Sequence, residues 1–166
     1  MLIEPKTLAT LYEAANLVEE FIANLVVEHG GAKSVSDLAT GVARAGYDFR
    51  LDNVPIELKM KASWKIPVEI ARDAAGQHPS GIATSTSEYV MVISPGHSSK
   101  LDATVAKVRL FPTKILLKEA MERPIDTRHF PSHSLTTSSL VHYVNSKQVP
   151  SEIYIGEFVC GTILPF

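Results

Sequence analysis

Cysteine, long apolar runs and surplus positive charge are all scarce in this sequence, and each scarcity excludes a class of protein. With Cys160 as the only cysteine, neither an internal disulfide nor a cysteine-rich zinc site is available. No apolar run approaches the roughly 20 residues that span a bilayer. The segment around Glu4, Pro5 and Lys6 lacks the apolar core of a signal peptide. We therefore expect an intracellular, cytoplasmic protein with no membrane partner.

The formal net charge of −2 restricts how the chain can bind nucleic acid. Proteins that hold nucleic acid through its phosphates usually carry a basic surplus. Any DNA-binding surface here must therefore be a local concentration of lysine and arginine that is offset by acids elsewhere. An acidic metal site would contribute to that offset.

Length and composition predict one domain over residues 1–166. Domains usually hold roughly 100–200 residues, and an apolar fraction of 45% supplies enough side chains for a core. Apolar residues at helical spacing predict a first helix from Leu8 to His29, with Thr7 as its N-cap and Gly30-Gly31 as its end.

The later segments alternate between helical and extended patterns. We expect further helices or helical turns at 36–45, 67–75, 114–123 and 138–147, strands at 89–94, 105–111 and 152–162, and loops at 77–87 and 128–137. With the hairpin described next, this order predicts an α/β (α+β) domain: a mixed central β-sheet flanked by helices.

Two short runs, 47–51 and 54–60, are separated by Asp52-Asn53, a pair that tolerates the positive φ of a two-residue hairpin turn. This turn pairs Leu51 with Val54 and continues outward along both strands. Phe49 then faces Ile56 and Asp48 faces Glu57. The apolar side chains of both strands fall on one face, and Asp48, Arg50, Glu57 and Lys59 fall on the other.

The polar face of this hairpin has the components of phosphodiester hydrolysis. Like charges that face each other across two strands are destabilising, so Asp48 opposite Glu57 indicates a bound cation. Mg²⁺ takes one or two carboxylates together with water and substrate phosphate. Lys59 lies two residues further along the same face, within reach of a water or a phosphate.

The segment Tyr47-Asp48-Phe49-Arg50-Leu51-Asp52-Asn53-Val54-Pro55-Ile56-Glu57-Leu58-Lys59 resembles the catalytic hairpin of the PD-(D/E)XK nuclease superfamily, with Tyr47 in place of the proline. The resemblance implies a restriction-endonuclease-like core in which Asp48 and Glu57 bind Mg²⁺, or Mn²⁺ in its place. It also implies that Lys59 positions or activates the attacking water. The superfamily often adds a glutamate from the first helix, which is Glu19 here because it falls within the apolar stripe of that helix.

A basic cluster follows the hairpin directly, as a surface that guides phosphates should. Its members are Lys59, Lys61, Lys65 and Arg72, of which Lys61, Lys65 and Arg72 are the predicted nucleic-acid contacts.

The residues of the hairpin also have purely structural explanations. Glu57 and Lys59 are of the kind expected on the solvated face of an antiparallel strand. Glu19 is then a boundary residue with its carboxylate in solvent. If the turn is longer than two residues, Asp52 replaces Asp48 as the acidic ligand.

The sequence as a whole predicts a Mg²⁺-dependent endonuclease that acts on DNA and forms a homodimer. Apolar surface for the dimer comes from Leu17 and Phe21 and from Ile163, Leu164 and Phe166 near the end of the chain. Two alternatives remain: a non-catalytic nucleic-acid-binding or assembly protein on the same fold, and a nuclease of RNA.

Overall fold

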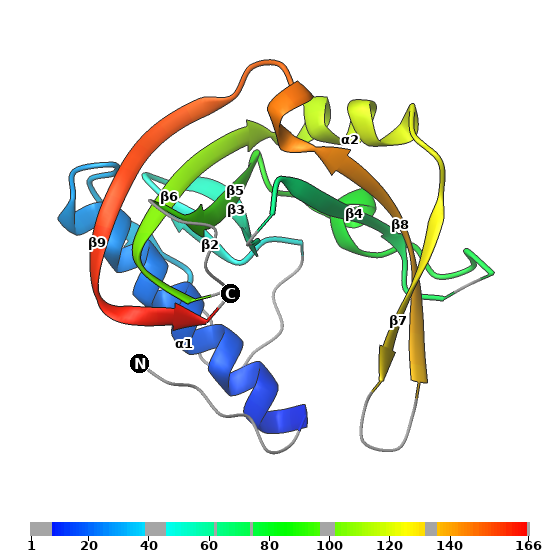
Figure 1. The fold of residues 1–166 in the computed structure, drawn as a ribbon, viewed down its shortest axis with the longest axis horizontal. Helices are drawn as coiled ribbons and strands as arrows, with labels where there is room; N and C mark the ends of the chain where they lie inside the picture. The colour runs from blue at the N-terminus through cyan, green and yellow to red at the C-terminus, as the bar shows by residue number, and fades with distance from the viewer. Residues whose placement is uncertain are drawn as a thin grey trace.

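The computed structural model describes residues 8–38, 46–61, 63–73, 75–96, 102–131 and 136–165 (Figure 1). Within these ranges the helices are α1 (Leu8–Glu28) and α2 (Thr113–Met121), with short 3₁₀ turns η1 (Gly81–Thr84) and η2 (Ser146–Gln148). The strands are β1 (Val35–Ser36), β2 (Phe49–Leu51), β3 (Val54–Met60), β4 (Lys65–Ala71), β5 (Tyr89–Pro95), β6 (Asp102–Pro112), β7 (Asp126–Pro131), β8 (Thr136–Asn145) and β9 (Ile153–Pro165).

The strands form two sheets. The first sheet has six strands in the order β1-β2-β3-β5-β6-β9, and the second has three in the order β4-β8-β7. In the first sheet β3 and β5 are parallel and the other neighbours are antiparallel. The chain between the parallel strands leaves the first sheet, forms β4 and η1, and returns as β5. This crossover places the start of β4 beside the end of β3.

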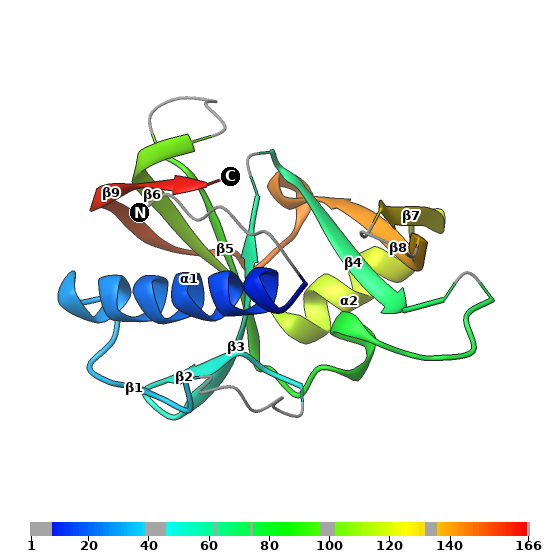
Figure 2. The same cartoon turned by 90° about the horizontal axis from the view of Figure 1, so that it is seen from below.

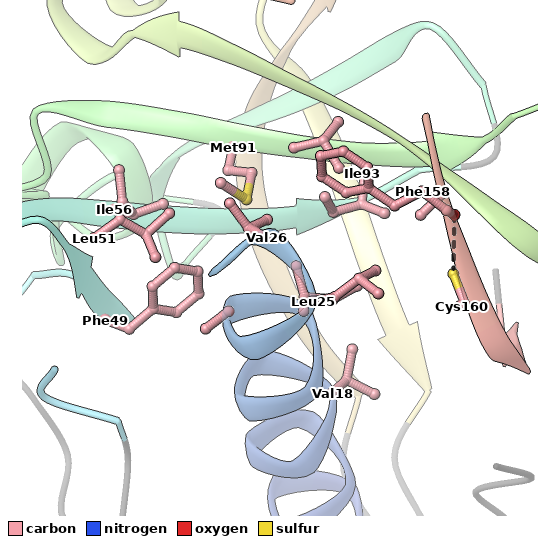
Figure 3. Close-up of a cluster of buried hydrophobic side chains, with 14 residues drawn as sticks. Val18, Leu25, Val26, Phe49, Leu51, Ile56, Met91, Ile93, Phe158 and Cys160 are labelled. Carbon is pink, nitrogen blue, oxygen red and sulfur yellow. Dashed lines mark hydrogen bonds between the residues drawn. The ribbon is translucent and has the colours of Figure 1, made fainter. Parts of the chain in front are cut away.

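The first sheet curves around α1 (Figure 2). The apolar stripe of the helix packs into the concave face, where Leu25 and Val26 share one core with Phe49, Ile56 and Met91; Figure 3 shows Val26 beside Ile56 and Met91. All five side chains are less than 5% exposed. Burying a side chain of this size stabilises the fold by about 1.5–3 kcal/mol, so this cluster fixes where the β2–β3 hairpin sits.

A second core lies on the opposite face of the first sheet. Val90 and Val92 alternate along β5 with Met91 and Ile93, so that β5 is buried on both faces. The second sheet and α2 cover this other side. The second core brings together residues of β4, η1, β5, β6, α2 and β8: Ile66, Val68, Ile82, Val90, Val92, Phe111, Leu116, Ala120 and Val144.

Cys160 lies in the first core and donates a weak hydrogen bond from its Sγ to the carbonyl oxygen of Phe158, at 3.6 Å. Burial raises the pKa of the Cys160 thiol, because a thiolate is poorly solvated in apolar surroundings. The cysteine therefore serves packing and is a weak nucleophile at neutral pH.

The predicted mixed α/β class is confirmed, with helices on both sides of the first sheet. The first helix, the hairpin and the strands at 89–94, 105–111 and 152–162 are present, and the helix predicted at 114–123 is α2. Thr7 and most of the predicted helical turn at 36–45 lie outside the described residues. None of the described helices has the length and apolar character needed to cross a membrane.

Three predicted elements are wrong, and all concern the second sheet. The helix predicted at 67–75 is wrong, because Lys65–Ala71 is the strand β4. The helix predicted at 138–147 is wrong, because Thr136–Asn145 is the strand β8. Part of the loop predicted at 128–137 belongs to β7 and β8. The β-branched residues of β8 favour a strand once a partner is present. Pro67 is tolerated because β4 is an edge strand, where one row of N–H groups needs no partner.

Candidate functional site

The β2–β3 hairpin has the predicted turn, and the predicted register from Leu51–Val54 to Phe49–Ile56. Asp52 and Asn53 have φ values of 48° and 67°, the positive values that a type I′ turn requires at both central positions. The ladder pairs Leu51 with Val54 and Phe49 with Ile56. The turn chemistry and the apolar alternation therefore specify the same pairing.

The two faces of the hairpin have different environments. Phe49 and Ile56 point into the first core, against α1. By strand alternation Glu57 and Lys59 point to the other face. The Glu57 side chain is 15% exposed and that of Lys59 is 28% exposed. Both charged groups are thus partly desolvated, which strengthens their interaction with each other and with a ligand.

Asp48 lies at the end of this ladder and departs from its regular pattern. The regular pairs end at Phe49 and Ile56, so the predicted Asp48–Glu57 pair is not formed and this part of the predicted register is wrong. The Asp48 N–H donates to the carbonyl oxygen of Ile56 at 2.8 Å, so two residues of one strand face one residue of the other, as in a β-bulge. The bulge turns the Asp48 carboxylate toward β3, where its Oδ2 accepts a hydrogen bond from the N–H of Leu58 at 2.6 Å.

Glu57 and Lys59 form an ion pair on β3, with 2.7 Å between Oε1 and Nζ. Leu58, whose N–H binds Asp48, is the residue between them. The two carboxylates and the ammonium group of the predicted site are therefore anchored on three consecutive residues of one strand. This compact arrangement offers hard oxygen donors and one cation to a ligand.

A pocket of about 240 Å³ opens where β3 ends and β4 begins. Its lining combines cationic, acidic and apolar side chains: Leu58, Lys59, Met60, Lys61, Pro67 and Glu69. The crossover from β3 to β4 creates it, because β4 leaves the plane of the first sheet.

Glu69 is the pocket residue that the sequence prediction missed. Its Oε1 accepts a hydrogen bond of 2.5 Å from the hydroxyl of Ser80. The sequence signal for Glu69 was the alternation of apolar Ile66 and Val68 with charged Lys65 and Glu69. This alternation predicts a strand once Pro67 is placed on an edge strand.

The other predicted site residues lie on several different elements. Lys61 lines the pocket, and Lys65 is exposed at the start of β4. Arg72 is exposed beyond the other end of β4, so it is separated from Lys65 by the length of the strand. Glu19 is half-buried on α1, which covers the face of the first sheet opposite to Glu57. Over the described part of the chain, no group of three or more His, Cys, Asp or Glu side chains gathers as a metal site.

Asp52, the alternative acidic ligand, holds a different part of the structure. Its carboxylate accepts hydrogen bonds from the backbone N–H groups of Lys33 and Ser34, both at 2.9 Å. These bonds tie the turn to the segment that leads into β1. Asp52 therefore organises the far end of the hairpin, away from Asp48.

We expect Asp52→Ala to lower the free energy of unfolding by about 1–3 kcal/mol, because two backbone donors lose their acceptor and alanine disfavours positive φ. Asn53→Gly is the matched control: glycine adopts positive φ without strain, so its effect should stay within about 0.5 kcal/mol. Urea denaturation of both variants measures the difference. Equal stabilities would show that the Asp52 hydrogen bonds contribute nothing.

Arg50, on β2, forms a polar cluster with Asp37 and Tyr47. Arg50 Nε donates to Asp37 Oδ2 at 3.0 Å, and its guanidinium lies 4.9 Å from the centroid of the Tyr47 ring. The hydrogen bond with the Tyr47 hydroxyl, followed by the contact with Asp37, raises the pKa of Arg50 above its ordinary value. Tyr47 therefore holds the Arg50 side chain in place.

Comparisons with protein-family models, with curated proteins and with solved structures find no match. The assignment of a function therefore depends on the residues and geometry described above.

Proposed function

We propose that this protein is a Mg²⁺-dependent endonuclease of the PD-(D/E)XK type that hydrolyses DNA phosphodiester bonds. The observation that carries the proposal is the hydrogen bond between the Asp48 carboxylate and the N–H of Leu58. It anchors the acid of one strand beside the middle residue of Glu57-Leu58-Lys59. The same bond also satisfies a backbone N–H of β3 where the pairing with β2 ends, so the variants below separate metal binding from a structural role.

The donor set fits a hard divalent cation. Asp48 and Glu57 would hold Mg²⁺, or Mn²⁺, with water and a substrate phosphate completing the coordination. When bound, the metal supplies charge stabilisation at the phosphate and lowers the pKa of a bound water. Glu19 stays a prediction as an additional ligand, and a Glu19→Gln variant tests it in the thermal melts with and without Mg²⁺ described below.

Lys59 has a role of its own in this proposal. Its ammonium group donates to Glu57 at 2.7 Å, and Lys59 is also one of the residues that line the pocket. In that position it holds a water, or a non-bridging phosphate oxygen, next to the carboxylates. The partly buried location strengthens its field at the phosphate. Lys61, on the same pocket, attracts the DNA backbone.

Metal binding is tested by Asp48→Asn. The amide oxygen of asparagine keeps an acceptor for the Leu58 N–H, so we expect the metal-free variant to melt at the wild-type temperature or slightly above it. Loss of one carboxylate charge should abolish the rise in melting temperature that Mg²⁺ gives the wild type. Thermal melts with and without Mg²⁺ measure both effects. Asp126→Asn, at an exposed position on β7, is the control that retains the Mg²⁺ response.

A metal-free melt that drops by several degrees, followed by a normal rise with Mg²⁺, would contradict this assignment. Asp48 would then be a purely structural residue of the bulge.

Cleavage is tested with supercoiled plasmid and with a four-way junction, each with and without Mg²⁺. We expect Mg²⁺-dependent cutting of at least one of these substrates, which separates restriction-type from structure-specific activity. Binding without cutting would favour the non-catalytic nucleic-acid-binding protein, and cutting of RNA alone would favour the RNA nuclease. Chromosomal or invading DNA as substrate agrees with the cytoplasmic location that we propose from the single cysteine.

We further propose a homodimer, because cutting two strands takes two sites and a C₂ pair is the commonest way to supply them. Leu17 and Val159 are 49% and 68% exposed, and both line an apolar groove of about 620 Å³ between α1 and β9. We expect Leu17→Asp to convert a dimer to a monomer that accumulates nicked plasmid, with light scattering as the measurement. A wild-type monomer that linearises plasmid would refute the dimer. The side chains of Ile163, Leu164 and Phe166 lie outside the described residues.

A further inference from the structure

Trp64 is an exposed aromatic side chain that immediately precedes β4, between the pocket residues Lys61 and Pro67 in the sequence. It is 56% exposed, and the Nζ of Lys147 lies 3.5 Å from the centroid of its ring. Lys61, three residues before it, lines the pocket, and Lys65, directly after it, is exposed. A large aromatic ring is thus presented to solvent against one lysine, with two more lysines close to it in the sequence.

The backbone of Trp64 is held by a buried polar network. Its carbonyl oxygen accepts a hydrogen bond of 2.8 Å from the N–H of Ser146. Ser146 is fully buried, and its hydroxyl accepts a hydrogen bond of 3.2 Å from Nη1 of Arg109. The Nε of Arg109 lies 3.7 Å from a carboxylate oxygen of Glu152. The ring is therefore exposed on a backbone that is fixed in place, and a fixed surface loses little entropy when it binds a ligand.

The neighbouring surface of the second sheet continues this chemistry. Lys65 pairs with Asn145, and Pro67 pairs with Tyr143, on the adjacent strands β4 and β8. Tyr143 is 37% exposed, and Pro67 is part of the pocket lining. An aromatic side chain and a lysine therefore lie on the same ladder that leads from Trp64 to the pocket. The opposite face of this ladder is filled by the second core.

Exposed aromatic rings interleaved with lysines match a chain that alternates flat bases with phosphates. Bases stack on aromatic rings whatever their sequence, and lysines follow the backbone. In a duplex the faces of the bases are already stacked on each other, so only an unpaired segment offers a face to the ring. An exposed contact between a lysine and a ring is weaker than base stacking, so Lys147 is free to leave the ring for a phosphate.

We propose that Trp64 is a stacking platform for a base in an unpaired segment of DNA, with Lys65 and Lys147 contacting the flanking phosphates. The inference deepens the proposed function, because the platform leads the strand to the pocket of Lys59 and Lys61. It makes the enzyme selective for DNA that contains single-stranded or branched segments.

Trp64 is the only tryptophan of the chain, so the intrinsic tryptophan fluorescence of the full-length protein reports on this side chain alone. We expect a short single-stranded oligodeoxyadenylate, added without divalent cations, to quench this fluorescence in a saturable way. The quenching should weaken as salt is raised, because phosphate contacts release counterions. A blunt duplex at the same nucleotide concentration should quench far less. Absence of quenching by the single strand, or equal quenching by the duplex, would overturn the proposal.

Variants extend the test, with the anisotropy of a labelled oligodeoxyadenylate as the readout. We expect Trp64→Ala to weaken binding by about 10-fold or more, as for other base-stacking aromatic residues, and Trp64→Phe to recover most of the affinity. Tyr154 is a chemically matched control, since it is 55% exposed and has the Nζ of Lys107 5.5 Å from its ring centroid. An equal loss in Trp64→Ala and Tyr154→Ala would overturn the assignment of the platform to Trp64.

The quenching experiment does not depend on whether the protein cuts DNA. Fluorescence quenching without cleavage would support the stacking platform and refute the nuclease. Mg²⁺-dependent cleavage without quenching would support the nuclease and refute the stacking platform.

Discussion

Lys59→Ala is expected to lower the rate of DNA cleavage by about 10²-fold or more, the range for a group that acts directly on the reacting atoms. The physical reason is the location of Lys59, whose ammonium group is bonded to Glu57 and which is one of the residues that line the pocket. Affinity for DNA should change little, because one phosphate contact among several is lost. The effect therefore falls on kcat, measured by single-turnover cleavage of plasmid at saturating enzyme.

Lys114→Ala is the matched control for this substitution. Lys114 is exposed on α2, and its removal lowers the net charge by the same amount without touching the hairpin. Thermal melts of both variants show whether folding is preserved, which we expect because a partly exposed ion pair contributes about 0–1 kcal/mol. A Lys59→Ala enzyme that cuts at nearly the wild-type rate would make Lys59 a structural partner of Glu57 and nothing more.

Phe49→Ala is expected to lower the free energy of unfolding by about 3–5 kcal/mol, the range for removing a large buried aromatic side chain. Phe49 has no solvent exposure and packs in the first core against α1. For a chain of this length such a loss lowers the melting temperature by roughly 10 °C. Because Phe49 follows Asp48 directly, the same change loosens the hairpin that carries the proposed site.

Met121→Ala provides the comparison for Phe49→Ala. Met121 is 59% exposed on α2, and its truncation should change the stability by no more than about 0.5 kcal/mol. Urea denaturation of both variants gives the two free energies directly. A loss below 1 kcal/mol in Phe49→Ala would mean that α1 does not hold the hairpin in place.

The sequence alone was sufficient to predict the hairpin and its register next to the turn. Both depend on neighbouring residues: Asp52-Asn53 defines the turn, and alternation then assigns Phe49 and Ile56 to the buried face. The first helix was predictable for the same reason, because one continuous apolar stripe specifies it. Local steric preferences and burial act on these segments in the same direction, so no distant residue was needed to choose the structure.

The second sheet was decided by contacts that are distant in the sequence. β4 and β8 are strands because each is the other's neighbour in the sheet, as in the pairing of Pro67 with Tyr143. Taken singly, each segment has a short apolar pattern that fits a helix as well as a strand. The loss of chain entropy on ordering either segment is recovered only when both pair and cover the second core.

The candidate site was also predicted only in part by the sequence. Which strands carry Asp48, Glu57 and Lys59 follows from the sequence, since the turn fixes their order. The bond from Asp48 to the Leu58 N–H, the entry of Glu69 into the pocket and the position of Glu19 across the sheet from Glu57 required the tertiary structure. Strand alternation determines only the face on which a side chain lies. A β-bulge, a crossover and the packing of a helix determine which side chains from separate elements meet there.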